Sequence, residues 1–157
     1  LSSAVENAKT EKKIHEFGVS NFTISQFEFL KNYTKLSTNQ IQFSVNYLSP
    51  LLSDNFLYYQ KNEIPLMVWS PLGNIFTSDN DSNTRIKKVL DKLSKKYNLS
   101  YNQLLISFIN KLPNSILPII GTTDIERVKE IQQCLNVNLE HSDWYELIEA
   151  SLGKRVD

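Results

Sequence analysis

The feature that most constrains the fold is a repeated alternation between short apolar runs and longer segments with helical spacing. Four runs, each bounded by polar turn residues, have the length and apolarity of buried strands: residues 14–19, 40–45, 65–69 and 116–120. Gly18, Gly73 and Gly121 each lie close to the end of such a run. Because the runs show little strict alternation, we expect strands covered on both faces, as in a parallel sheet between helices.

Between the runs, apolar residues recur at the helical period, and several of these segments open with capping residues. The clearest segment, 86–97, has one apolar face and a run of lysines on the other. A second, opened by Thr123-Asp124-Ile125-Glu126, is expected to bury four apolar side chains: Ile125, Val128, Ile131 and Leu135. Further helices are predicted after Thr23, over 54–62, after Ser100 and over 142–152, where Gly153 ends the chain's last helix.

This order of elements predicts an α/β fold in which parallel strands are joined by right-handed crossovers. Four such units fit either a small open sheet or half of an eight-unit barrel. A complete (β/α)8 barrel needs roughly 250 residues. The chain has 157 residues, so a whole barrel is excluded.

Charge and composition exclude several classes of partner and site. Seventeen basic side chains balance seventeen acidic ones, which argues against a nucleic-acid partner because such affinity comes from excess Lys and Arg. No apolar stretch approaches the roughly 18 residues of a membrane span. The single cysteine, Cys134, fits a reducing compartment, so we expect a cytoplasmic protein. His15 and His141 have no neighbours at metal-ligand spacing, so no metal site is predicted.

Polar, aromatic and glycine residues follow or end the predicted strands. The segments are Ser20-Asn21-Phe22, Asn39-Gln40-Ile41-Gln42, Trp69-Ser70-Pro71-Leu72-Gly73 and Gly121-Thr122-Thr123. Ligands of parallel α/β folds bind at the carboxyl ends of the strands, where helix N-termini offer free N–H groups. This set contains no acid or base. It suits a neutral amide, a flat ring and a phosphate, and it does not suit proton transfer.

These segments, together with Pro118-Ile119-Ile120 and Glu126-Arg127, resemble in order and spacing those of the aldo-keto reductase superfamily, and most closely a bacterial subgroup of YdhF-like oxidoreductases. The resemblance implies a partial (β/α)8 TIM barrel. Residues 1–157 would form a single, incomplete domain with strands five to eight and their helices, and residues 1–13 would be the tail of the fourth helix. It further implies a truncated NADP-dependent oxidoreductase of the type that reduces a small carbonyl substrate to an alcohol by hydride transfer.

The family's catalytic Asp, Tyr, Lys and His belong to strands one to four, so no catalytic residue is assigned here and the chain alone is expected to be inactive. The resemblance assigns cofactor contacts instead. Ser20, Asn21 and Gln40 would bind the nicotinamide carboxamide, and Trp69 would stack on its ring. Ser70, Pro71, Leu72 and Gly73 would approach the pyrophosphate, while Gly121, Thr122, Thr123, Arg127 and Glu130 would contact the adenosine end.

Two departures from the family bear on the choice of cofactor. Gly121 stands where many members have a Lys, and Ile131 stands where an adenine-contacting Asn is common. A preference for NADP therefore depends on Arg127, and NAD is the alternative.

Two other functions stay open at this stage. The chain could be a non-catalytic nucleotide-binding or interaction module, a decayed half-barrel, or an unrelated doubly wound domain. A half-barrel has two open sheet edges and an uncovered concave face. We therefore expect the isolated chain to self-associate or to pair with the missing N-terminal half.

Overall fold

The computed structural model describes residues 1–113 and 115–156 and contains one four-stranded parallel sheet in the order β1-β2-β3-β4. The strands are β1 (Val19–Ser20), β2 (Asn39–Gln42), β3 (Leu66–Trp69) and β4 (Ile116–Pro118). The helices are α1 (Ser2–Thr10), α2 (Ile24–Lys31), α3 (Asn55–Lys61), α4 (Asp81–Tyr97), α5 (Tyr101–Asn110), α6 (Ile125–Gln133) and α7 (His141–Leu152). The predicted α/β order and parallel pairing are confirmed.

The two faces of the sheet differ. Register partners in a parallel sheet point to the same side, so Asn39, Leu66 and Ile116 share one face, while Gln40, Met67 and Leu117 share the other. On the first face Asn39, Ile41, Leu66 and Val68 are buried against helices. On the second, Leu117 is 56% exposed. Among the described residues only one face is covered, so the prediction of burial on both faces is wrong. The sequence of β2 did indicate one-sided burial, because the polar residues Gln40 and Gln42 alternate with Asn39 and Ile41.

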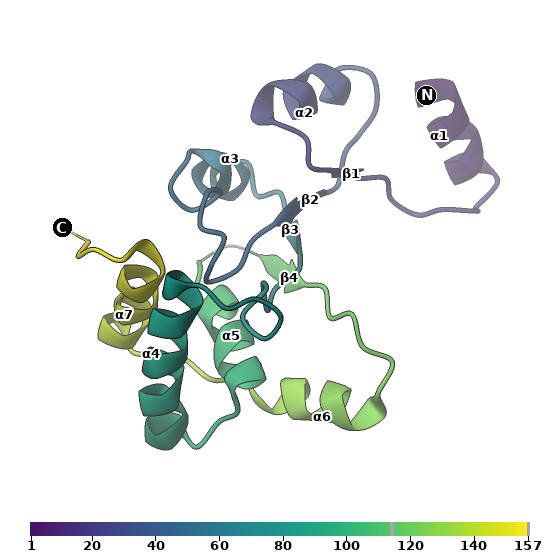
Figure 1. Cartoon of the computed structure of the whole chain (residues 1–157). Helices are drawn as coiled ribbons and strands as arrows, with labels where there is room; N and C mark the ends of the chain where they lie inside the picture. Colours follow the sequence, from purple (N-terminus) through teal and green to yellow (C-terminus); the bar gives the residue numbers. More distant parts are fainter. Residues whose placement is uncertain (114, 157) are drawn as a thin grey trace.

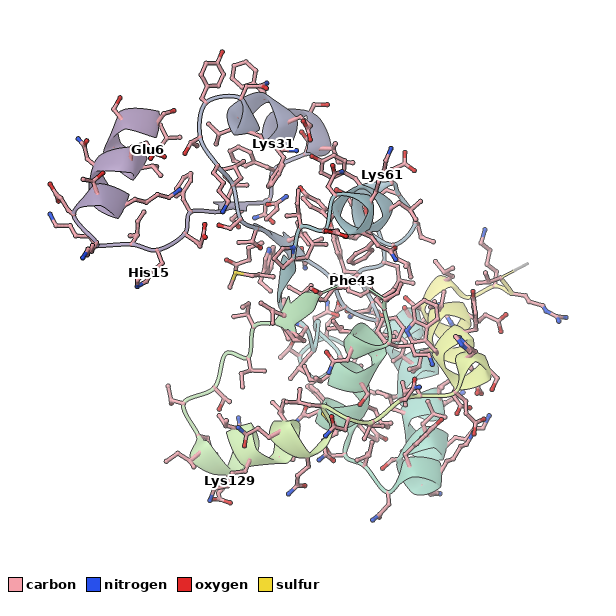
Figure 2. The ribbon with its side chains drawn as sticks, turned by 180° about the vertical axis from the view of Figure 1, so that it is seen from behind. Glu6, His15, Lys31, Phe43, Lys61 and Lys129 are labelled. Atoms are coloured by element: carbon pink, nitrogen blue, oxygen red, sulfur yellow. The ribbon has the colours of Figure 1, made fainter. Side chains whose placement is uncertain are left out.

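The core lies between the covered face and helices α3, α4, α5 and α7. Phe43, which follows β2, is fully buried in it and stacks on Phe108 of α5 at 5.9 Å between ring centroids. Figure 2 shows Phe43 near the middle of the molecule, and Figure 1 shows α4, α5 and α7 grouped on one side. Helix α1, which carries Glu6, lies apart from this group (Figure 2). Most of the buried apolar residues therefore lie in the C-terminal two thirds of the chain.

Helix starts follow the capping chemistry that the sequence predicts at two places. The side chains of Thr23 and Ser100 each accept a hydrogen bond from the backbone N–H of the third helical residue, a glutamine. The side-chain oxygen of that glutamine accepts one in turn from the backbone N–H of the cap residue. Helix α6 differs, because Asp124 and not Thr123 is its N-cap. At the end of α7, Gly153 adopts a left-handed φ of 71°, as expected for a C-cap glycine.

All four strands are shorter than the apolar runs that suggested them, and the first two differ most from their runs. The run 14–19 forms only β1, because its pairing begins where the Val19 N–H donates to the carbonyl of Thr38. Gly18 thus precedes a strand, and an added Cβ there would lie 2.5 Å from Thr38 Cγ2. The run 40–45 leaves the sheet after Gln42, since Ser44 turns to bond with Tyr47.

The expected burial of helix α6 is also wrong. The helix has no buried residue, and Ile125 is 69% exposed. Ile125 is its first residue, and Leu135, 54% exposed, lies beyond its end. The helix contacts α5, and in its middle Val128 and Ile131 are partly buried.

Candidate functional site

The carboxyl ends of the strands bring together residues that lie far apart in the sequence. Ser20, Gln40 and Met67 are register partners on the open face, and Gln42 is paired with Trp69 two residues further on. The hydroxyl of Ser20 donates to the Gln40 carbonyl at 3.2 Å, and the Asn21 N–H donates to the same oxygen at 2.8 Å. The side-chain amide of Gln40 makes no hydrogen bond to another described residue. It is therefore free to bind a ligand.

The segment after β3 turns sharply. Ser70 and Gly73 both have left-handed φ, 54° and 59°, while Pro71 between them is buried. At Gly73 an added Cβ would lie 1.9 Å from Oδ1 of Asn46. Glycine at this position thus permits close approach of a neighbouring side chain, a role that the sequence did not suggest.

A groove of about 400 Å³ runs from this turn to the segment after β4. Eight residues assigned from the sequence lie in its wall: Trp69, Ser70, Pro71, Leu72, Gly73, Gly121, Thr122 and Arg127. Its volume lies within the range of roughly 300–1,000 Å³ that small-molecule sites occupy. The fold thus unites the segments after β3 and β4 in one groove.

The charged end of the groove is formed at the start of α6. Arg127 is 68% exposed in its side chain and lies 3.6 Å from the carboxylate of Asp124, a long and solvent-screened contact. Thr122 Oγ1 accepts a hydrogen bond from the Asp124 N–H at 3.1 Å. Apart from the two chain neighbours of Gly121, no atom of the described residues lies within 4 Å of the position of an added Cβ there, so the wall is open at this point.

Five assigned residues lie outside this wall: Ser20, Asn21, Gln40, Thr123 and Glu130. Thr123 is exposed, and the Glu130 carboxylate accepts a hydrogen bond from the Ser100 hydroxyl. Asn21 has a left-handed φ of 57°, and its Oδ1 accepts a hydrogen bond from Trp69 Nε1 at 2.9 Å. This bond links the ends of β1 and β3 across β2.

Sequence reasoning missed part of the groove. Asn102, near the start of α5, lies in its wall, as do Ile119 and Ile120. The apolar run predicts Ile119 and Ile120 as part of the fourth strand, but β4 ends at Pro118. Asn102 follows the capping residue Ser100 by two positions, and that capping pattern is the only sequence signal that placed it near a helix start.

The described wall of the groove contains no Asp, Glu, His, Lys, Tyr or Cys. Arg127 is the only charged residue among those of its wall that the structure describes. The tyrosines with perturbed pKa lie elsewhere: burial raises the pKa of Tyr58, Tyr59 and Tyr97, and a hydrogen bond to Asp91 raises that of Tyr101 to about 12. A general acid works best with a pKa near the operating pH. None of these tyrosines meets that condition.

The part of the chain that the structure describes holds no group of three or more His, Cys, Asp or Glu residues placed to bind a metal ion. None of its helices is long and apolar enough to cross a membrane.

Relatives of the chain support the same architecture. It is 30% identical over 158 residues to the uncharacterized oxidoreductase YcsN of Bacillus subtilis, an alignment that covers 98% of this chain and 53% of that protein. It is 31% identical over 160 residues to the oxidoreductase YdhF of Escherichia coli, covering 99% and 53%. The chain therefore spans about half the length of these curated relatives.

The fold matches solved structures. A crystal structure of an aldo/keto reductase from Klebsiella pneumoniae in complex with NADP and acetate superposes with a TM-score of 0.77 at 20% identity, covering 93% of this chain and 51% of that one. The four parallel strands and their helices thus have the fold of a partial (β/α)8 barrel. A family model described as the aldo/keto reductase family matches residues 1–151. The chain belongs to the aldo/keto reductase family.

Proposed function

We propose that this chain carries the cofactor-binding surface of an NADP(H)-dependent reductase that converts a small carbonyl substrate to an alcohol. The observation that carries the proposal is the 400 Å³ groove, in whose wall a left-handed glycine turn, a hydroxyl and an arginine lie at the ends of β3 and β4. The residues fit an extended dinucleotide, because backbone N–H groups and an arginine suit phosphates. A structural neighbour that binds NADP supports the choice of ligand.

Each part of the surface has a distinct role in this proposal. The free amide of Gln40, with Ser20 and Asn21 beside it, would hydrogen-bond the nicotinamide carboxamide, and Trp69 would pack against the ring. Ser70, Pro71, Leu72 and Gly73 would cradle the pyrophosphate. Gly121, Thr122, Thr123, Arg127 and Glu130 would surround the adenosine end, with Arg127 as the cation for a 2'-phosphate. When bound, NADPH supplies the hydride.

The chain's own residues bind and orient the cofactor and supply no acid or base. We therefore propose that residues 1–157 act as one incomplete domain and that this chain by itself reduces no carbonyl compound. A non-catalytic nucleotide-binding module is the second candidate function. The absence of a titratable acid or base from the described wall favours it.

The uncovered face of the sheet suggests a protein partner. Met67 and Leu117 point to this face, and the edge strands β1 and β4 each have one unpaired side within the described residues. Paired edges and a covered inner face are what a barrel requires. We propose that the 157-residue chain, purified by itself, covers this face with a second copy.

Titration of the purified chain with NADPH, followed by nicotinamide fluorescence, tests the cofactor proposal. Arg127→Ala is expected to weaken NADPH binding about 10-fold, as a charge-assisted hydrogen bond to phosphate is lost. Lys129→Ala is the matched control, because Lys129 has the same charge on the same helix and pairs with Glu126 outside the groove.

The same titration with NADH separates the two cofactors, since NADH lacks the 2'-phosphate. Arg127→Ala should leave NADH binding unchanged. If NADPH produces no signal with the wild-type chain, the cofactor site is refuted. A carbonyl-dependent loss of NADPH absorbance would support an enzyme and contradict the proposed inactivity.

A further inference from the structure

A second recess, of about 610 Å³, borders the cofactor groove at Trp69. Its wall combines the end of β1, the end of β2 and the long segment between β2 and α3. Trp69 is the residue that the two cavities share. The hydrogen bond from its indole to Asn21 holds the ring at this boundary.

Four polar side chains of this recess are not used by the fold, whereas Asn21, Thr23, Ser53 and Asn55 are hydrogen-bonded within it. Gln42, Tyr47, Ser49 and Asp54 line it, and none of these side chains makes a hydrogen bond to another described residue. Tyr47 is 42% exposed, so its hydroxyl is accessible. An amide, two hydroxyls and a carboxylate together offer donors and acceptors for several partners at once.

The charge of the wall defines the class of ligand. Asp54 is the only charged residue among those that line the recess, and the wall contains no Lys, Arg or His. An anionic ligand would meet a carboxylate without a compensating cation, which is unfavourable. The rings of Trp69 and Tyr47 provide flat surfaces on which the C–H face of a small polar molecule can pack.

We propose that this recess binds a neutral polyhydroxylated molecule of monosaccharide size. Its hydroxyl groups would donate to Asp54 and exchange hydrogen bonds with Gln42, Tyr47 and Ser49, while one face of the molecule packs on Trp69. The recess shares only Trp69 with the groove, so it is a separate binding site that borders the cofactor groove.

Saturation-transfer NMR on the purified chain tests this proposal and tolerates self-association. The probes are glycerol, D-glucose, D-galactose, D-mannose and D-fructose, with D-gluconate as the anionic counterpart. At least one neutral sugar should bind saturably in the millimolar range, and D-gluconate should bind more weakly than D-glucose. Absence of saturable binding by all the neutral probes, or tighter binding of D-gluconate, would overturn the proposal.

Two variants locate the binding in the recess. Tyr47→Phe removes only an unbonded hydroxyl, and Asp54→Asn removes only the charge, so each should fold normally and weaken sugar binding about 3- to 10-fold. Tyr33→Phe is the matched control, since Tyr33 is an exposed tyrosine outside the recess. If Tyr47→Phe and Asp54→Asn both bind sugar as the control does, the site is wrong.

A further variant separates this proposal from that of the cofactor site. Arg127→Ala should leave the sugar signals unchanged, because Arg127 lies outside the recess. Loss of NADPH binding with retained sugar binding would therefore refute only the cofactor site, and the reverse result would refute only the recess.

Discussion

At the scale of single residues, two glycines of the groove differ in whether the structure can accept a side chain in their place. Gly73 has a left-handed φ of 59°, and an added Cβ would strike Asn46, whose side chain is held by Ser44 and Asn83. We expect Gly73→Ala to lower the free energy of unfolding by about 2–4 kcal/mol, from strain and displaced hydrogen bonds. Gly121→Ala meets open space and should change it by less than about 0.5 kcal/mol. Urea denaturation of both variants checks this, and equal midpoints would contradict it.

Neighbouring residues of β2 have opposite roles because they point to opposite faces. Asn39 is fully buried, donates to the Phe22 carbonyl at 2.8 Å and to the Tyr59 hydroxyl at 2.7 Å, and is thus part of the scaffold. Asn39→Ala should cost about 2–3 kcal/mol of stability, since buried partners lose their hydrogen bonds. Gln40→Ala should keep the stability and weaken NADPH binding. Thermal unfolding and cofactor titration of both variants test the contrast, and an unstable Gln40→Ala would contradict it.

At the scale of elements, the lysine run of α4 joins two helices. Lys96 Nζ lies 2.7 Å from Asp143 and 2.8 Å from Glu140, and Lys92 lies 2.8 Å from Glu146, all on α7 or its N-cap. At the other end Arg85 donates to the carbonyl of Ala150 at 2.8 Å. The sequence pattern predicted that the lysine face of α4 is solvated. Only part of this face is, because Lys92 and Lys96 pair with acidic residues of α7 and its N-cap.

Asp143 gives this helix pair a pH dependence. Burial alone would raise the pKa of its carboxyl, but the hydrogen bonds from Lys96 and Tyr97 outweigh burial and lower it. The stabilisation is therefore fully present above the unfolded-state pKa of about 3.9 and is lost as the pH falls through the lower folded-state value.

Asp143→Asn should accordingly cost about 1–3 kcal/mol near neutral pH and progressively less below about pH 4. Urea denaturation from pH 3 to 7 measures this. Asp79→Asn is the control, because the Asp79 side chain is 97% exposed and should show no such trend. A cost for Asp143→Asn that does not change with pH would count against the assignment.

At the scale of the whole molecule, the sheet is covered on one face and open on the other. Light scattering at micromolar concentration should show the isolated chain as a dimer or larger assembly. Leu117→Lys, which places a charge on the open face, should shift it toward monomer. Leu135→Lys is the matched control, because Leu135 has nearly the same exposure, 54% against 56%, but lies after α6. A monomeric wild-type chain would refute self-association through this face.

By itself, the sequence determined the local elements: capping at Thr23 and Ser100, the amphipathic α4, the glycine end of α7, and the order that makes the strands parallel. These depend on residues a few positions apart, so spacing and side-chain chemistry suffice to predict them. Only the tertiary structure decided which side each strand residue faces, because that depends on pairing partners 20 to 50 positions away. It alone separated Asn39 from Gln40, brought Asn102 into the groove, left Ile125 in solvent and set Trp69 between two cavities.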